Sequence, residues 1–176
     1  MVRFDASNAE CLVFTFKEGL LSAVAHDLKI RVGTFVIEVD ETTRVIDARF
    51  DARSLRVVCA MRDRVDAPDA LTAANKREIE ANIVRDVLDA QTFPEIRFAS
   101  SAVMEQKAVY AVKGTLTIKD RTRRITVKVR EQDGTYVAEA RVHQPDFGIE
   151  PYRALLGTLK VKPDVRVRVS VPLRGR

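Results

Sequence analysis

The chain has 176 residues, which is the size of one domain with a substantial hydrophobic core. Its hydrophobic content of 46% and charged content of 31% are those of a globular protein and exclude a disordered one. No run of about 18 apolar residues is present, which argues against a transmembrane helix. The net charge of +5 permits an anionic partner, yet the basic residues alternate along the chain rather than cluster, which is typical of a soluble surface.

The first 19 residues give no indication of export. They lack the uninterrupted apolar core of a signal peptide, because Lys17 and Glu18 end a short apolar run. The two cysteines, Cys11 and Cys59, are expected to be free thiols, as in a reducing compartment. We therefore expect a cytoplasmic protein, with the periplasm as the alternative if an export signal precedes this sequence.

Four segments in the N-terminal third alternate apolar and polar side chains with the period of two that is typical of strands. These segments are residues 11–17, 28–32, 35–39 and 46–52. In the first of them we assign Leu12, Phe14 and Phe16 to the inward face. Gly33 separates the second from the third, and a glycine within a strand indicates a bend of the kind that a closing sheet needs.

One segment, residues 72–90, has a helical period instead. Its apolar stripe consists of Ile79, Ile83, Val84, Val87 and Leu88. Asn75, with Glu78 three residues later, indicates the helix start. The helix should end before Phe93–Pro94, because the residue that precedes a proline is disfavoured in a helix. The stripe is one-sided, so we expect the helix to pack on the sheet, after which a strand resumes at residues 93–98.

The longest alternating stretch, residues 110–129, predicts a hairpin. Its first arm places Tyr110, Val112, Gly114, Leu116 and Ile118 on one face. After a polar break at residues 120–123, Ile125, Val127 and Val129 continue that face. The opposite face is cationic and hydroxylated. Because an isolated hairpin is unstable in water, this one must curl with other strands around an apolar interior.

Two further strands, at residues 136–142 and 165–171, bring the number to about eight, and a helical turn is expected at residues 150–156. Consecutive antiparallel strands with one helical excursion predict an all-β fold, a closed or nearly closed antiparallel β-barrel with the helix of residues 72–90 packed on it. No linker or repeat interrupts the pattern, so residues 1–176 are expected to form a single domain.

The sequence leaves two interpretations of the barrel interior open. A barrel of about eight strands is either filled by side chains or holds one slim ligand. The chain has no Trp and only 6% aromatic residues. Small side chains recur at inward positions, namely Ala48, Ala52, Gly114, Ala138 and Ala140. They leave a slot between facing strands unless neighbouring Phe and Leu side chains fill it.

Several motifs together resemble the YceI-like family of isoprenoid-binding proteins. Three of them are FPEIRF at residues 93–98, VKGTLTIKDRTRRITVKV at 112–129 and QPDFGI at 144–149. Two more, AHDLKIRVGTF at 25–35 and REIEANIVRDVLDA at 77–90, resemble one branch of that family. Each motif alone is weakly specific, but the five follow the family's order along most of the chain.

The resemblance implies a lipocalin-like barrel and a homodimer. It implies a long apolar tunnel for an extended amphiphile, such as a polyisoprenoid, a quinone tail or a fatty-acid derivative. We expect a carrier of such a ligand, with no other cofactor and no enzymatic activity. The predicted tunnel-lining residues are Leu12, Phe14, Leu28, Ile30, Phe35, Phe50, Phe98, Leu116, Ile118 and Tyr136. Phe147 and Tyr152 are predicted near the ligand entrance, and His26 is predicted to contact the ligand head group.

Other functions find weaker support in the sequence. His26 and Asp27 are adjacent, and adjacent residues of a strand point to opposite faces, which disfavours a catalytic pair. His26 and His143 are the only histidines, and neither has the spacing of a metal site. The rivals to a carrier are a filled barrel that acts through its surface and a barrel that binds single-stranded nucleic acid. The second is disfavoured because the aromatic residues are assigned to inward faces, away from the cationic face.

Overall fold

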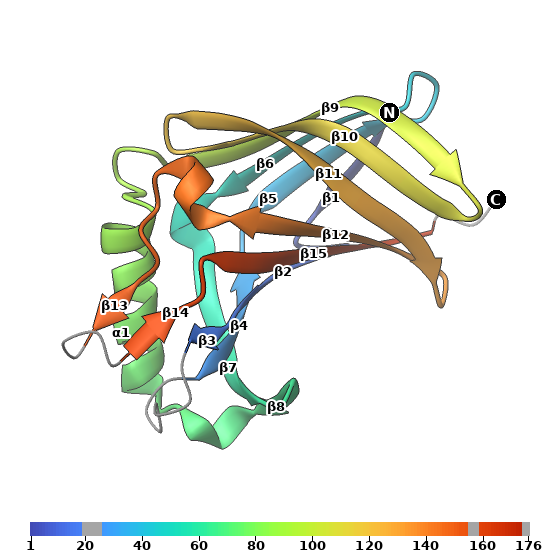
Figure 1. Cartoon of the computed structure of the whole chain (residues 1–176). Coiled ribbons are helices and arrows are strands. Elements are labelled where there is room, and N and C mark those ends of the chain that lie inside the picture. The colour runs from blue at the N-terminus through green and yellow to red at the C-terminus, as the bar shows by residue number, and fades with distance from the viewer. Residues whose placement is uncertain (19–25, 155–158, 174–176) are drawn as a thin grey trace.

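The computed structural model describes residues 1–18, 26–154 and 159–173. Twelve strands form one antiparallel sheet, in the order β1-β5-β6-β9-β10-β11-β12-β15-β2-β4-β7-β8. Figure 1 shows this sheet curled around the middle of the molecule. The bounds are β1 Val2–Asp5, β2 Glu10–Thr15, β4 Asp27–Val32, β5 Phe35–Asp40, β6 Val45–Asp51, β7 Leu55–Arg62, β8 Val65–Ala67, β9 Glu95–Gln106, β10 Val109–Ile118, β11 Arg121–Gln132, β12 Thr135–His143 and β15 Asp164–Pro172.

A smaller sheet and short helical turns complete the fold. The second sheet pairs three short strands, β3 Lys17–Glu18, β14 Leu159–Val161 and β13 Arg153–Ala154. The helical elements are α1 Ala73–Asn82, the π-helical η3 Ile83–Val87, and the 3₁₀ turns η1 Ala52–Ser54, η2 Pro68–Ala70 and η4 Gln144–Phe147. No helix among the described residues is long and apolar enough to cross a membrane.

The predicted barrel is confirmed, with more strands than the eight expected because three long strands are bent. β4 continues into β5 through Gly33 and Thr34, β1 into β2 through residues 6–9, and β6 into β7 through η1. Neighbouring bent strands pair along both halves. β1 pairs with β5 and β2 with β4, and on the other side of this strand β5 pairs with β6 and β4 with β7. Three bent strands, five unbroken ones and the short β8 thus make up the twelve-stranded sheet of the described residues, which curls around the interior.

Hydrogen bonds between neighbouring bends hold this corner of the barrel. The Gly33 N–H donates to the Ser54 carbonyl oxygen over 2.9 Å, and the Thr34 N–H donates to Ser54 Oγ over 3.0 Å. A β-carbon at Gly33 would lie 3.1 Å from the Ser54 carbonyl oxygen, which is tighter than ordinary contact. Glycine therefore lets the two bent strands approach closely, as the interruption of the alternating pattern predicted.

The helical segment lies across one end of the barrel, at the left of Figure 1. Thr72 caps the helix, since its side chain accepts from the Asn75 N–H and the Asn75 side chain accepts from the Thr72 N–H. The predicted helix start at Asn75 is thus three residues late. η3 then ends at Val87, before Phe93–Pro94 as predicted.

The central hairpin is confirmed with a shorter turn than predicted. Ile118 pairs directly with Arg121, so the turn consists of Lys119 and Asp120, with Lys119 at φ 57°. The predicted helical turn at residues 150–156 is wrong for its described part, because residues 150–152 are irregular and Arg153 begins β13. Residues 155 and 156 lie outside the described residues.

Candidate ligand-binding cavity

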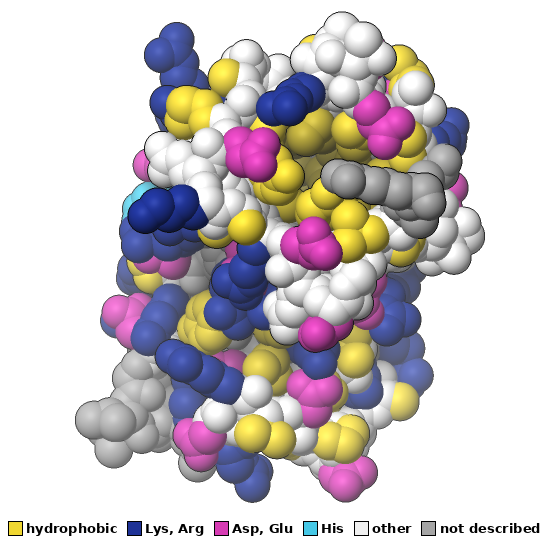
Figure 2. Space-filling view, turned by 90° about the vertical axis from the view of Figure 1, so that its right-hand side faces the viewer, with side chains coloured by type: hydrophobic (Ala, Val, Ile, Leu, Met, Phe, Trp, Pro, Cys, Tyr) yellow, Lys and Arg dark blue, Asp and Glu magenta, His cyan; other side chains and the backbone are white. Residues whose placement is uncertain are grey.

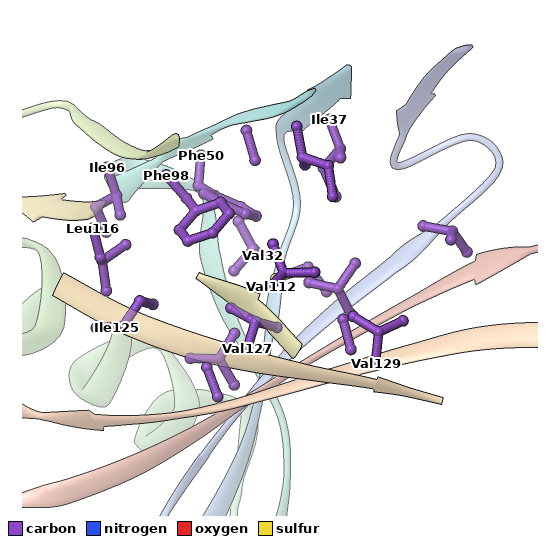
Figure 3. A pocket seen from close by; sticks show the side chains of 18 of the residues that line it. Val32, Ile37, Phe50, Ile96, Phe98, Val112, Leu116, Ile125, Val127 and Val129 are labelled. Atoms are coloured by element: carbon purple, nitrogen blue, oxygen red, sulfur yellow. The ribbon is translucent and has the colours of Figure 1, made fainter. Parts of the chain in front are cut away.

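The barrel encloses a cavity of about 970 Å³. Its walls are aliphatic and aromatic side chains from the surrounding strands, and Figure 3 shows Val32, Ile37, Phe98, Val112 and Val127 converging on it. Packed protein interiors contain few voids larger than a water molecule, whereas ligand sites measure about 300–1,000 Å³. The interior is therefore open rather than filled.

Strand alternation and small side chains produce this space. The inward positions of β10 and β11 alternate as predicted, and Leu116, Ile118 and Ile125 line the cavity. Ala48, Ala138 and Ala140 also line it, so three of the five small residues leave room. Gly114 does not, because a β-carbon there would lie 2.6 Å from Phe98 Cζ, and the Phe98 ring thus occupies that space.

The two ends of the cavity differ in character. At the helical end, Ile83, Val87 and Leu88 contribute apolar side chains. The charged lining residues come from strand ends and turns on the opposite side; they are Asp40, Glu41, Arg44, Glu105 and Glu131, and we call this end the mouth. Figure 2 faces this side and shows an apolar recess among acidic side chains.

Six of the ten predicted tunnel-lining residues do lie on the cavity wall. They are Ile30, Phe50, Phe98, Leu116, Ile118 and Tyr136. The Tyr136 ring packs edge-on against the Tyr110 ring, with 6.2 Å between the ring centroids. That any of these side chains contacts a ligand stays a prediction.

The inward face assigned to β2 is wrong. Cys11, Val13 and Thr15 line the cavity, whereas Leu12 and Phe14 lie on the outer face in a separate apolar cluster with Met61. The Arg166 guanidinium lies 5.0 Å from the Phe14 ring centroid and covers it. Both faces of this strand carry apolar side chains, so a period of two could not decide which one points inward.

Phe14 and Phe16 are thus aromatic residues on the cationic outer face, contrary to the sequence argument against nucleic-acid binding. Phe14 is nevertheless only 4% exposed, and Arg166 lies over both rings. Stacking with a base would require the arginine to leave, so this face offers no open aromatic platform.

The remaining predicted residues pack elsewhere. Phe35 and Phe147 are buried in the main core without lining the cavity, and Leu28 packs against that core. Phe35 lies beside Phe50 at 6.0 Å between ring centroids, and of the two only Phe50 lines the cavity. Tyr152 lies by the helix, where its hydroxyl accepts from Asn82 Nδ2 over 3.2 Å.

His26 directly precedes β4 and does not line the cavity. The neighbouring Asp27 carboxylate accepts from the Lys17 N–H over 2.8 Å, so its observed hydrogen bond is to the backbone of another strand. His143 Nδ1 lies 2.8 Å from Asp164 Oδ1 in a partly exposed pair away from the cavity. No group of three or more His, Cys, Asp or Glu residues in the described part of the chain is arranged to hold a metal ion.

The structure adds lining residues that the sequence argument missed. The helical stripe was recognised, but Ile83, Val87 and Leu88 close the cavity rather than pack only on the outside of the sheet. Gln144 and Cys11 line it as well. Cys11 and Cys59 are free and buried, and burial raises the pKa of both thiols, that of Cys11 to about 12.

Fold and cavity define a lipocalin-like antiparallel barrel with a large apolar binding space. A model of the YceI-like domain matches residues 4–173, and the chain belongs to the YceI-like family. No curated protein matches the chain.

Solved structures share the fold at low sequence identity. BcnA of Burkholderia cenocepacia superimposes with a TM-score of 0.63 and 17% identity, over 93% of this chain and 94% of that one. The YceI protein of Campylobacter jejuni gives a TM-score of 0.61 and 14% identity, over 92% and 91% of the two chains. YceI-like proteins are generally binding proteins.

Proposed function

We propose that this protein binds, carries or sequesters a long apolar amphiphile without chemically converting it. The observation that carries the proposal is the 970 Å³ cavity with its almost continuous aliphatic wall. A polyisoprenoid, a quinone tail or a fatty-acid derivative has the elongated apolar chain that such a wall accommodates.

The energetics agree with a binding function. Each buried methylene contributes about 0.8 kcal/mol, so roughly ten would give about 8 kcal/mol. Association costs at least about 4 kcal/mol. The difference supports useful affinity without a catalytic group and with loose selectivity for chain length. Free thiols further support a reducing compartment, and we propose a cytoplasmic location.

Native mass spectrometry of gently purified protein tests the proposal. We expect an adduct with the mass of a lipid, and uptake of prenyl or long-chain probes after delipidation. An apo mass with no uptake would favour the second candidate, a barrel that acts only through its surface. The same spectra report whether the protein is the homodimer that we propose.

Single-stranded nucleic acid is the less favoured partner, because Arg166 covers the two outer phenylalanines. Retention on single-stranded DNA that falls steeply with salt would contradict this view.

A further inference from the structure

Gln144 is the one polar or charged side chain among the described residues that is buried as deeply as the core. It is 7% exposed, and it lines an otherwise apolar part of the cavity. A buried polar group is unfavourable unless it has a hydrogen-bond partner. The position of its amide therefore calls for an explanation.

The surrounding backbone fixes the Gln144 amide. Its backbone N–H donates to the Pro163 carbonyl oxygen over 2.9 Å, at the start of η4. The side-chain Nε2 donates to the Lys162 carbonyl oxygen over 3.1 Å. Because a carbonyl oxygen only accepts, the nitrogen must face Lys162, and Oε1 is turned away from it.

Oε1 is left as an acceptor that the cavity can reach. Within residues 1–18, 26–154 and 159–173, no protein group donates to it. In the same residues, no fully buried side-chain oxygen or nitrogen lacks a partner. Gln144 lines the cavity, so the acceptor capacity of its amide oxygen lies at the cavity wall.

Thr15 adds a second uncharged polar group at this end. Phe14 pairs with Arg166 in the antiparallel pair of β2 and β15, so Thr15 lies beside Val165, near the start of β15. Val142 pairs with Val165 from the other side. Gln144 flanks the same start of β15 from the other side, through its bond to Pro163. Both residues line the cavity, and they lie at the end remote from the charged mouth.

No described cationic side chain lines this end of the cavity. The only basic lining residue in the described part of the chain is Arg44, and it lies at the mouth beside the carboxylates. A carboxylate or phosphate head group would be desolvated near Gln144 without a counter-charge, which is strongly unfavourable. An uncharged hydroxyl that donates to Oε1 would meet no such penalty.

We propose that Gln144 and Thr15 form a polar subsite at the inner end of the cavity, which binds the hydroxyl of a neutral long-chain alcohol and directs its tail toward the mouth. This inference rests on the proposed function and narrows it to uncharged, hydroxyl-bearing amphiphiles such as prenols or fatty alcohols. Gln144 determines head-group specificity, and the aliphatic wall binds the tail.

Three probes with the same C15 prenyl chain test the subsite: the alcohol, the hydrocarbon and the carboxylic acid. Affinities are measured by displacement of a fluorescent apolar dye from delipidated protein. We expect the alcohol to bind about tenfold tighter than the hydrocarbon, as one hydrogen bond to a buried acceptor allows, and the acid to bind more weakly than the alcohol at neutral pH.

Gln144→Leu should lower the affinity for the alcohol about tenfold and leave that for the hydrocarbon unchanged. Thr15→Val, a smaller change of shape, should act in the same direction, which guards against misfolding of the first variant. Gln91→Leu on the exposed turn is the matched control and should change neither.

Equal binding of alcohol and hydrocarbon by the wild type would overturn the subsite while leaving the carrier function intact. An equal loss for both probes in Gln144→Leu would also overturn it, because that pattern indicates packing alone. Binding of none of the three probes would overturn the carrier function as well.

Discussion

The Cys11 thiol faces the apolar cavity and is 1% exposed. Burial, with a smaller contribution from Glu10, raises its pKa from 9.0 to about 12. A folded-state pKa above the unfolded value means that the folded protein holds the proton more tightly. The corresponding stabilisation is complete below pH 9 and is lost as the pH rises toward 12.

We therefore predict that alkaline pH destabilises the wild type more than Cys11→Ala. Between pH 8 and pH 10 the free energy of unfolding of the wild type should fall by about 1 kcal/mol more than that of the variant. Urea unfolding at the two pH values measures both. Parallel losses in the two proteins would contradict the prediction, because other titrating groups are common to both.

Gly114 and Phe98 form a second residue-scale determinant. A β-carbon at Gly114 would overlap the Phe98 ring and the Ala99 carbonyl oxygen, at the point where the register between β9 and β10 shifts. Gly114→Ala should lower the free energy of unfolding by about 1–3 kcal/mol through overpacking. Chemical denaturation measures the loss.

A double-mutant cycle with Phe98→Leu serves as the control for this prediction. Trimming the ring should recover part of the cost of Gly114→Ala, so the two changes together should cost less than their sum. Strict additivity would show that the ring does not limit the site.

At the scale of elements, two side chains fasten α1 to β7. The Glu80 carboxylate accepts from the Val57 N–H over 2.7 Å, and Lys76 Nζ donates to the Val58 carbonyl oxygen over 2.8 Å. Both bonds satisfy backbone groups of a strand next to the helix. The helix thus provides hydrogen bonds to β7 that a neighbouring strand would otherwise make. η3, which continues directly from α1, contributes Ile83 and Val87 to the cavity wall.

Glu80→Ala should lower the free energy of unfolding by about 1–3 kcal/mol, because the part-buried Val57 N–H then loses its acceptor. Hydrogen exchange at the Val57 amide should accelerate more than elsewhere in β7. Glu78→Ala, on an exposed position of the same helix, is the matched control and should change neither quantity. Unchanged exchange at Val57 in the Glu80 variant would contradict the role of this contact.

The elements also show how far the sequence predicts the fold. Strict alternation predicted the central hairpin and both of its faces. Val112 and Val127 pair with each other and line the cavity, whereas Lys113 and Thr126 pair on the opposite face. It failed at β2, where Leu12 and Cys11 are both apolar. The arginines that cover the outer face of β2 at Phe14 come from β15, a strand far along the chain.

The candidate site was predictable only in part for a similar reason. Inward strand positions such as Ile118 followed from periodicity, and the family resemblance indicated the cavity. The helical end and Gln144 did not follow, since they depend on how α1 and η4 return to the barrel. Contacts between distant segments decide such positions, and no local period encodes them.

At the scale of the whole molecule, the curled sheet maintains a large apolar space in its interior. Filling an apolar cavity with well-packed side chains commonly stabilises a protein, but it often reduces the protein's function. Ala140 lines the cavity in the middle of β12, opposite Val167 on β15, and is therefore a position where added volume enters the open space.

We predict that Ala140→Leu raises the free energy of unfolding of the ligand-free protein by about 0.5–2 kcal/mol and weakens the binding of long-chain probes. Thr126→Leu adds a similar side chain to the exposed outer face of β11 and should change neither binding nor stability by a comparable amount. Urea unfolding and dye displacement on the same samples measure the two effects.

A destabilised Ala140→Leu would mean that the space is too narrow for the added methyl groups. Unimpaired binding would mean that ligands do not use the cavity. The combination of higher stability and lower affinity is expected only if the open interior is maintained at the expense of packing.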